Sequence, residues 1–323
     1  MNKILVTGSA GFIGFHLSKR LLQEGYEVYG IDNMNSYYDV RLKEERLKIL
    51  KKNKNFNFKI IDISDYSNLK SIFLKNNFSF VFHLAAQPGV RYSFENPQRY
   101  IDSNIKGFIN VLDSCNEHSV NKLFYASSSS VYGNTPKVPF VEDDTSIQPI
   151  SLYGVTKKMN EDLARTYHES FNLNTIGLRF FTVYGPWGRP DMALFKFTDR
   201  IMNNKPIELY NQGKHNRSFT YIDDIIESMI LLYNKYSSSD NFNDIINIGG
   251  AKTTNLMDFV NNIEYAIGKK ANLKFLPIQK GDLVDTVSSS EKLNSIINFS
   301  PLINIKEGID RFVGWYKEYK GIL

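Results

Sequence analysis

The first half of the chain alternates short runs of β-branched and aromatic residues with longer amphipathic segments. Between the first two runs, Phe15, Leu17, Leu21 and Leu22 recur at helical spacing, which predicts an amphipathic helix over residues 12–24. Strands that are separated by helices need crossover connections, so we expect an α/β fold with a doubly wound, mostly parallel sheet. Such a sheet binds its ligands at the carboxyl ends of the strands. The runs predict strands at residues 3–7, 26–31, 56–61, 80–84, 122–127 and 174–180.

The pattern changes after residue 180. Proline and glycine cluster at residues 184–190, and shorter segments follow. Residues 221–233 predict a helix opened by Asp223 and Asp224, since carboxylates are favourable at a helix N-terminus. We therefore expect a first domain over residues 1–180 and a smaller α/β domain over residues 181–323, from which about residues 215–250 return to the first domain.

The composition is that of an ordinary folded protein. The chain has 323 residues, of which 42% are hydrophobic and 23% charged, so it can bury a large core and a disordered chain is excluded. Cys115 is the only cysteine, which excludes an internal disulfide and a cysteine-based zinc site. We expect no metal, a buried helical position for Cys115, and a reducing compartment, the cytoplasm.

Charge and hydropathy exclude two further kinds of partner. The net charge is +5, from 39 basic and 34 acidic residues without a dense basic run, so no nucleic acid is expected. No stretch reaches the ~18 apolar residues that span a bilayer, and the N-terminus lacks the apolar core of a signal peptide, so no membrane is expected. A weakly positive protein suits a phosphorylated small molecule.

A glycine-rich loop follows the first predicted strand. Gly8, Gly11 and Gly14 have the spacing G-x-x-G-x-x-G, and Phe12 and Ile13 lie between the last two at the start of the predicted helix. Glycine lets the backbone turn tightly and approach a pyrophosphate, while the helix N-terminus supplies N–H donors. Glycines also mark ordinary turns, but the order strand, turn, helix favours a dinucleotide site.

The ends of three further strands add to this site. Asp32, with Asn33 beside it, ends the second strand, where a carboxylate can accept hydrogen bonds from both ribose hydroxyls and repel a 2′-phosphate. The predicted cofactor is therefore NAD, although a strand can also simply end in aspartate. The other expected contacts are Asp62 and Ile63 beside the adenine, and Leu84, Ala85 and Ala86, where small residues allow close approach.

Tyr153 and Lys157 have the spacing Y-x-x-x-K, which places them one helical turn apart. A nearby ammonium lowers the pKa of a tyrosine and makes it a usable base, so both are expected to be catalytic and to lie beside the cofactor. Upstream, serines 127–130 end the fifth strand, and a hydroxyl there can relay a proton. Two further copies, Tyr66/Lys70 and Tyr316/Lys320, lack such a serine run and are expected on solvated helix faces.

These features together resemble the extended short-chain dehydrogenase/reductase family over essentially the whole chain. Longer segments at residues 85–93, 151–154 and 178–193 are similar to UDP-glucuronate 4-epimerases, including the capsule-biosynthesis type. The resemblance implies a Rossmann-type NAD-binding domain and a smaller nucleotide-sugar-binding domain. It also implies NAD-dependent epimerisation at C4 of a UDP-sugar, UDP-glucuronate to UDP-galacturonate, through a transient 4-keto intermediate.

The resemblance further implies roles for individual side chains. Ser128 is the expected catalytic hydroxyl, with Ser127 and Ser129 as alternatives. Arg217 is the expected diphosphate clamp, because a guanidinium can pair two oxygens. Arg189 pairs the sugar carboxylate or forms a salt bridge within its turn. The other expected substrate contacts are Gln87, Arg91, Ser129, Thr182, Gln279, where many relatives carry arginine, and Asp282, on a ribose hydroxyl.

Three reactions share this scaffold: epimerisation, dehydration and decarboxylation. Dehydratases of the family carry Asp-Glu where this chain has Ser129 and Ser130, and decarboxylating relatives carry Glu at the position of Ser130. Both are therefore disfavoured. The alternatives are a 4-epimerase for UDP-glucose or UDP-N-acetylglucosamine, a non-catalytic NAD-binding protein, and a net oxidoreductase.

Relatives commonly form dimers through two helices that pack as a four-helix bundle. Residues 97–115 and 153–171 could supply these helices, so a homodimer is expected. An apolar helical stripe alone cannot distinguish a core from an interface.

Overall fold

The computed structural model describes residues 3–135, 137–250, 252–279, 283 and 285–322. The chain divides into two compact units. The first comprises Met1–Thr135, Thr145–Phe180 and Met229–Ile246, and the second comprises Pro136–Asp144, Phe181–Ser228 and Asn247–Leu323.

A parallel sheet forms the centre of the first unit. In the described residues it has seven strands in the order β11-β6-β5-β4-β1-β2-β3, and the pairings from β6 through to β3 are parallel. The predicted α/β fold with a doubly wound parallel sheet is confirmed, whereas β11, at one edge, was not predicted. The strands are β1 (Lys3–Thr7), β2 (Glu27–Asp32), β3 (Phe56–Ile60), β4 (Phe78–His83), β5 (Lys122–Ser128), β6 (Asn174–Phe180) and β11 (Asn243–Ile248).

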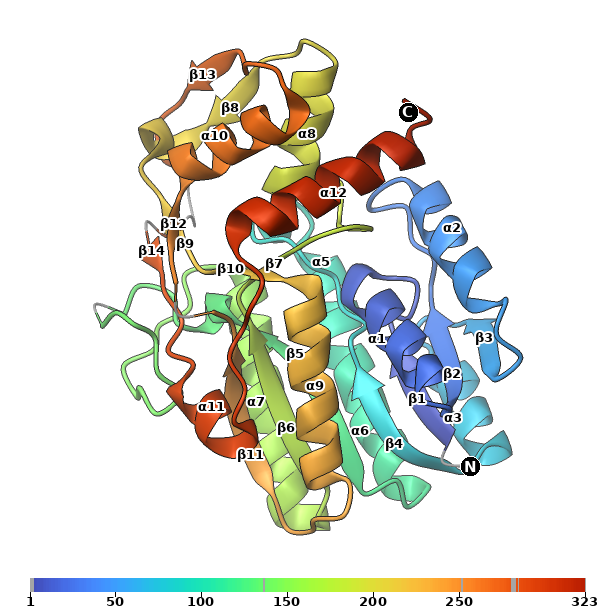
Figure 1. Cartoon of the computed structure of the whole chain (residues 1–323). Coiled ribbons are helices and arrows are strands. Elements are labelled where there is room, and N and C mark those ends of the chain that lie inside the picture. Colours follow the sequence, from blue (N-terminus) through green and yellow to red (C-terminus); the bar gives the residue numbers. More distant parts are fainter. Residues whose placement is uncertain (1–2, 136, 251, 280–282, 284, 323) are drawn as a thin grey trace. The chain divides into compact units, whose positions relative to one another are not determined.

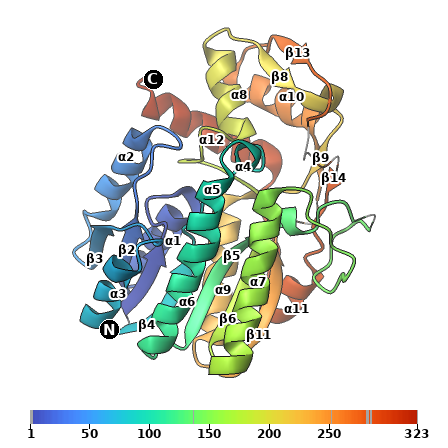
Figure 2. The same ribbon diagram turned by 180° about the vertical axis from the view of Figure 1, so that it is seen from behind.

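Helices cover both faces of this sheet. Figure 1 shows α1 and the lower part of α9 on one face, and Figure 2 shows α6 and α7 on the other. A π-helical turn, Ile101–Lys106, joins α5 to α6. The helices are α1 (Phe12–Gln23), α2 (Val40–Leu50), α3 (Tyr66–Lys75), α4 (Tyr92–Glu95), α5 (Pro97–Tyr100), α6 (Gly107–Glu117), α7 (Leu152–Phe171) and α9 (Ile222–Tyr236), which belongs to the first unit from Met229 onward.

Alternation along the strands supplies a core on each face. Leu5 and Leu123 belong to a cluster that also contains residues of α3, α6 and α7. On the other face, Tyr233 of α9 packs against Phe80 and Phe82 of β4. Cys115 is buried in α6, as predicted.

The second unit consists of short strands and of helices packed around aromatic side chains. Phe195 of α8 contacts the rings of Phe312, Trp315 and Tyr316 of α12. The strands are β7 (Thr182–Tyr184), β8 (Ile207–Leu209), β9 (Asn216–Arg217), β10 (Phe219–Tyr221), β12 (Thr254–Asn255), β13 (Leu273–Phe275) and β14 (Asp285–Thr286). The helices are α8 (Ala193–Met202), α10 (Leu256–Ile267), α11 (Glu291–Ile297) and α12 (Ile305–Tyr319).

The described residues contain neither a membrane-spanning helix nor a cluster of metal ligands. None of the helices in that part of the chain combines the length and the apolar character needed to cross a membrane. The same residues contain no group of three His, Cys, Asp or Glu side chains placed to hold a metal ion.

Two leucines of α3 test how far the core stabilises the fold. Leu69 is fully buried, whereas Leu74, one and a half turns later, is 67% exposed. We expect Leu69→Ala to lower the free energy of unfolding by about 2–5 kcal/mol, because it leaves a cavity, and Leu74→Ala to change it by about 0.5 kcal/mol or less. Urea denaturation of both variants measures this, and equal effects would contradict the placement of α3.

Candidate active site

The glycine loop joins β1 to α1 by close backbone contacts. The Gly11 amide donates to the Gly8 carbonyl at 2.9 Å, and Gly8 has a φ of +70°. A Cβ on Gly14 would lie 2.1 Å from the Gly8 oxygen, so a side chain at position 14 would force the loop open. Phe12 is buried, and Ile13 is half-buried. Gly11 caps α1 without a side-chain hydrogen bond, which suits an anion at the helix N-terminus.

The loop after β4 lies against the glycine loop. A Cβ on Gly8 would meet the Ala85 amide nitrogen at 2.8 Å. Thr7 Oγ1 accepts hydrogen bonds from the amides of Leu84 and Ala85, both at 3.1 Å, and therefore donates to His83 Nδ1 at 2.9 Å. Burial lowers the pKa of His83 to about 3, so this ring is neutral. Sequence analysis missed Thr7 and His83, because their spacing along the chain carries no signal.

Three of the predicted cofactor residues come together where β2 and β3 end. Asp32 is buried and accepts from the Met34 amide at 2.8 Å, while Asn33 donates to Asp62 at 2.8 Å. Burial raises the pKa of Asp62, but hydrogen bonds from Asn33 and Ser64 outweigh it and hold this pKa below its usual value.

Near these three residues, the structure differs from the sequence prediction at Lys43 and Ile63. The buried Lys43 of α2 lies 3.4 Å from Asp32, and the sequence analysis did not identify this ion pair. Ile63, expected beside an adenine, has its side chain in the hydrophobic cluster between the sheet and α3. Cys115 belongs to the same cluster.

Tyr153 and Lys157 lie on the first turns of α7. The Ser151 hydroxyl caps this helix by accepting from the Gly154 amide at 3.0 Å, and Gly154 lets the helix pack tightly against the Ser130 carbonyl. Lys157 is 2% exposed, and its Nζ donates to the Ala126 carbonyl at 2.8 Å. Burial lowers the pKa of Lys157 to about 7, and the carboxylate of Glu161 opposes this shift.

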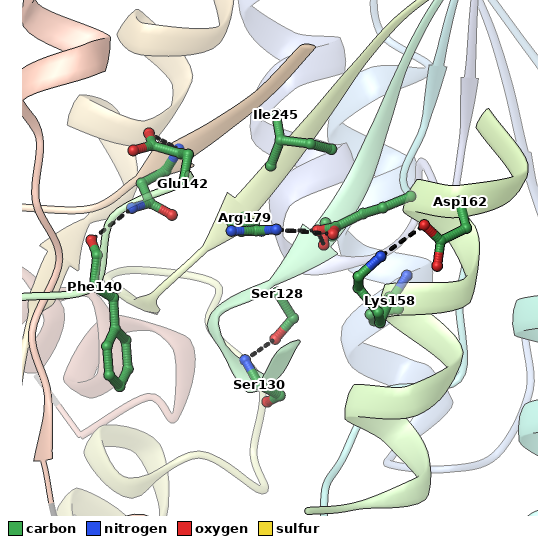
Figure 3. Close-up of polar contacts among 12 residues, drawn as sticks. Ser128, Ser130, Phe140, Glu142, Lys158, Asp162, Arg179 and Ile245 are labelled. Carbon is green, nitrogen blue, oxygen red and sulfur yellow. Dashed lines mark hydrogen bonds and ion pairs between the residues drawn. The ribbon is translucent and has the colours of Figure 1, made fainter. Parts of the chain in front are cut away.

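The serines at the end of β5 point in different directions. The Ser127 hydroxyl donates to Glu161 Oε1 at 2.6 Å, so it is held toward α7. The Ser128 hydroxyl accepts from the Ser130 amide at 3.1 Å, as Figure 3 shows. Ser129 and Ser130 are half-buried in a 3-10 turn. The engagement of Ser127 favours Ser128 as the relay hydroxyl, and this assignment stays a prediction.

The predicted substrate residues of the first unit follow β4. Gln87 is buried, and its backbone N–H and carbonyl are both bonded to the side chain of Asn104 in the π-helical turn. Asn104 also donates to Thr156 of α7 at 3.1 Å. Arg91 is exposed at the start of α4. Nothing in the sequence pattern indicated Asn104, because its partners lie far away along the chain.

The remaining predicted substrate residues belong to the second unit. Thr182 begins β7, and Arg189 forms an ion pair with Asp191 at 2.5 Å. Arg217, on β9, donates to the carbonyls of Asn216 at 3.0 Å and Leu283 at 2.5 Å. Gln279 is half-buried. Asp282 lies outside the described residues.

The two other Y-x-x-x-K copies have structural partners. Tyr66 and Lys70 both contact Glu117. The prediction of a solvated face was wrong for Tyr316, which is buried and donates to Asp199 at 2.6 Å because α12 packs this ring against α8.

Comparison with known proteins places the chain in a family. The model of the NAD dependent epimerase/dehydratase family matches residues 4–249. The chain belongs to this family. The family prediction is therefore confirmed.

Individual relatives match over almost their whole length. The chain is 46% identical to Protein CapI of Staphylococcus aureus, over 98% of this chain and 99% of that protein. It is 44% identical to a UDP-glucuronate 4-epimerase of Thermodesulfobacterium geofontis, over 98% of this chain and 97% of that protein. The fold also matches a solved structure, that of a UDP-glucuronic acid 4-epimerase from Bacillus cereus in complex with UDP-glucuronic acid and NAD. The two structures superpose with a TM-score of 0.92 and 34% sequence identity, over 98% of this chain and 99% of that one.

Gly14 offers a test of the glycine loop. We expect Gly14→Ala to lose NAD, because its Cβ would clash with the Gly8 carbonyl and open the loop. Gly314→Ala in α12 is the control, since a Cβ there meets nothing within 4 Å. NAD released from the purified, heat-denatured proteins is measured by absorbance, and an unchanged NAD content in Gly14→Ala would contradict the assignment.

Proposed function

We propose that this protein epimerises UDP-glucuronate to UDP-galacturonate at C4, with NAD as cofactor. One observation supports the proposal: Lys157 donates to the Ala126 carbonyl of β5, the strand that ends in Ser128, and Tyr153 lies one turn before Lys157 on α7. We propose that Tyr153 as the base, Lys157 as its activating cation and Ser128 as the hydroxyl act together at the end of this strand. The relatives named above support the same reaction, which is also the one that the sequence predicts.

The residues of the first unit fit NAD. The uncapped start of α1 and the glycine loop would hold the pyrophosphate, and Asp32 would accept from the ribose hydroxyls, which favours NAD over NADP. When bound, the nicotinamide supplies the hydride acceptor and donor for C4. The remaining proposed contacts are Phe12, Ile13, Asn33, Asp62, Ile63, Leu84, Ala85, Ala86, Tyr153 and Lys157.

Tyr153 and Lys157 handle the proton of the reaction. The Lys157 ammonium stabilises the phenolate of Tyr153, which removes the O4 proton of the sugar through or beside Ser128. Tyr153 returns this proton to O4 after the 4-keto sugar has turned over. The keto uronate is a β-keto acid that readily loses CO₂, so the site must restrain the carboxylate. Arg189 and the hydroxyls of the serine run are the proposed restraints.

The two units divide the binding. We propose that residues 1–180 form the NAD-binding domain and residues 181–323 mainly the nucleotide-sugar-binding domain, with part of residues 215–250 returning to the first. Arg217 would clamp the diphosphate, and the further proposed contacts are Gln87, Arg91, Ser129, Thr182, Gln279 and Asp282. We also propose that the enzyme works in the cytoplasm, where its buried thiol stays reduced.

Turnover of three substrates tests this function. We expect the protein to convert UDP-glucuronate faster than UDP-glucose or UDP-N-acetylglucosamine, with UDP-galacturonate as the product in chromatography. We expect Tyr153→Phe to lower kcat by about 10²–10⁴-fold, because it removes the base. Tyr66→Phe, in another Y-x-x-x-K copy, is the control, since that hydroxyl bonds Glu117 and should not affect turnover.

Other products would contradict parts of the proposal. A neutral UDP-hexose as the best substrate would overturn the uronate assignment. A UDP-pentose as main product would mean decarboxylation, and reduced cofactor in excess over enzyme would mean net oxidation. Native turnover by Tyr153→Phe would remove Tyr153 from the mechanism.

We propose that the protein is a homodimer. Val155 and Met159, one turn apart on α7, are 48% and 44% exposed, and Ile101 at the end of α5 is 42% exposed. Figure 2 shows α7 beside α5 and α6, so these apolar side chains are carried by neighbouring helices. A second copy that presents the same helices would bury them in a four-helix bundle.

A charge on this helix face tests the dimer. We expect Met159→Glu to sediment as a monomer, because a carboxylate in an apolar interface leaves an unpaired buried charge. Leu74→Glu on α3 is the control, since Leu74 is exposed on another helix. Sedimentation velocity measures both, and a monomeric native protein would contradict the proposal.

A further inference from the structure

Glu161 of α7 and Arg179 of β6 form a buried ion pair in the first unit. Arg179 Nε lies 2.8 Å from Glu161 Oε1, and Arg179 Nη2 lies 2.9 Å from Oε2, so the pair is bidentate. Both side chains are 5% exposed or less. Figure 3 shows Arg179 reaching from its strand toward α7.

This pair also holds the segment that contains the serine run. The Ser127 hydroxyl donates to Glu161 Oε1 at 2.6 Å, and the guanidinium of Arg179 lies 4.7 Å from the centre of the Tyr132 ring. One carboxylate therefore joins β5, α7 and β6, and its counterion contacts the turn that follows β5. Buried ion pairs add little net stability compared with apolar side chains of similar size, so stability alone does not explain this one.

The position of Glu161 on α7 connects the ion pair to the proposed chemistry. Glu161 lies one turn after Lys157 and two turns after Tyr153, on the same helix face. Lys157 bonds the Ala126 carbonyl, and Glu161 bonds the hydroxyl of the next residue, Ser127. Two adjacent residues of β5 are thus tied to two adjacent turns of α7, directly before Ser128.

We propose that Glu161 is a positioning residue of the epimerase, which acts through Ser127 and Lys157 to fix Ser128 against Tyr153, with Arg179 as its counterion. This inference rests on the proposed function and assigns a role to a side chain that touches neither substrate nor cofactor. A small displacement between a base and its relay group lowers the rate of the chemical step but leaves the affinity for the substrate almost unchanged. We therefore expect a substitution of Glu161 to lower kcat with little change in KM.

The carboxylate also acts on the charge of Lys157. Glu161 on α7 and His83 on β4 interact electrostatically with this ammonium, while Tyr125 on β5 and Arg179 on β6 interact with Glu161. His83 is neutral, and burial holds the Tyr125 pKa well above its usual value, so that phenol is neutral as well. Glu161 raises the pKa of Lys157 against the effect of burial. Without this carboxylate, the ammonium loses its proton at lower pH.

Glu161→Gln tests the proposal, because it keeps the shape of the side chain and removes its charge. We expect kcat for UDP-glucuronate to fall about tenfold or more while KM and bound NAD stay near native values. We expect the alkaline limb of the pH–rate profile to move by about half a pH unit or more toward lower pH. Glu169→Gln is the matched control, because Glu169 lies on the same helix in an exposed pair with Arg165.

Two outcomes separate positioning from a purely structural role. A Glu161→Gln protein with a lower melting temperature, native kcat and an unmoved alkaline limb would overturn the proposal. Failure of the unaltered protein to turn over any UDP-sugar would overturn the proposed function, and this inference with it. An active native enzyme whose Glu161→Gln variant behaves like Glu169→Gln would overturn only the positioning role.

Ser127→Ala provides a second test that does not leave a buried charge unpaired. It removes one hydroxyl from Glu161 and leaves Arg179 in place, so we expect folding as in the native protein and a kcat lowered by about three- to tenfold. Native kcat would overturn the proposal. A loss as large as that of Ser128→Ala would overturn it too, because Ser127 would then be the relay itself.

Discussion

The attachment of α7 to the end of β5 is the contact on which the candidate site depends. Lys157 enters the protein far enough to bond the Ala126 carbonyl, and this depth also fixes Tyr153 one turn earlier. The same burial lowers the pKa of Lys157 to about 7, while Glu161 opposes the shift. One packing arrangement therefore sets both the position of the proposed base, Tyr153, and the charge of Lys157, the group proposed to activate it.

A second constraint is the close backbone packing between the glycine loop, the start of α1 and the loop after β4, where the pyrophosphate is expected to bind. Gly14 packs on the Gly8 carbonyl, and Gly8 packs on the Ala85 amide, at distances that no Cβ allows. The Thr7 hydroxyl holds the Leu84 and Ala85 amides, so the ends of β1 and β4 form one unit. Glycine is required at position 14 because of contact with other backbone, and at position 8 because of such contact and of a φ of +70°.

The sequence predicted what depends on local pattern. Strand β6 was expected at residues 174–180 and is observed at Asn174–Phe180, because its β-branched and aromatic residues Thr175, Ile176 and Phe180 favour a strand. Strand β11 and the π-helical turn were missed, since β11 forms only where β6 offers an edge. The partners of Asp32, Gln87 and Ser127 were missed as well, because Lys43, Asn104 and Glu161 meet them only through the tertiary fold.

The two arginines proposed to bind the substrate are held by different groups. Arg217 donates to the carbonyls of Asn216 and Leu283, which hold its guanidinium in place, and a guanidinium can pair two oxygens of the proposed diphosphate. Arg189 is paired with Asp191, so a sugar carboxylate would have to replace that partner. Both side chains of this pair are partly exposed, and such pairs contribute about 1 kcal/mol or less. Exchanging one carboxylate for another at Arg189 therefore costs little, and a local ion pair of this kind is compatible with a binding role.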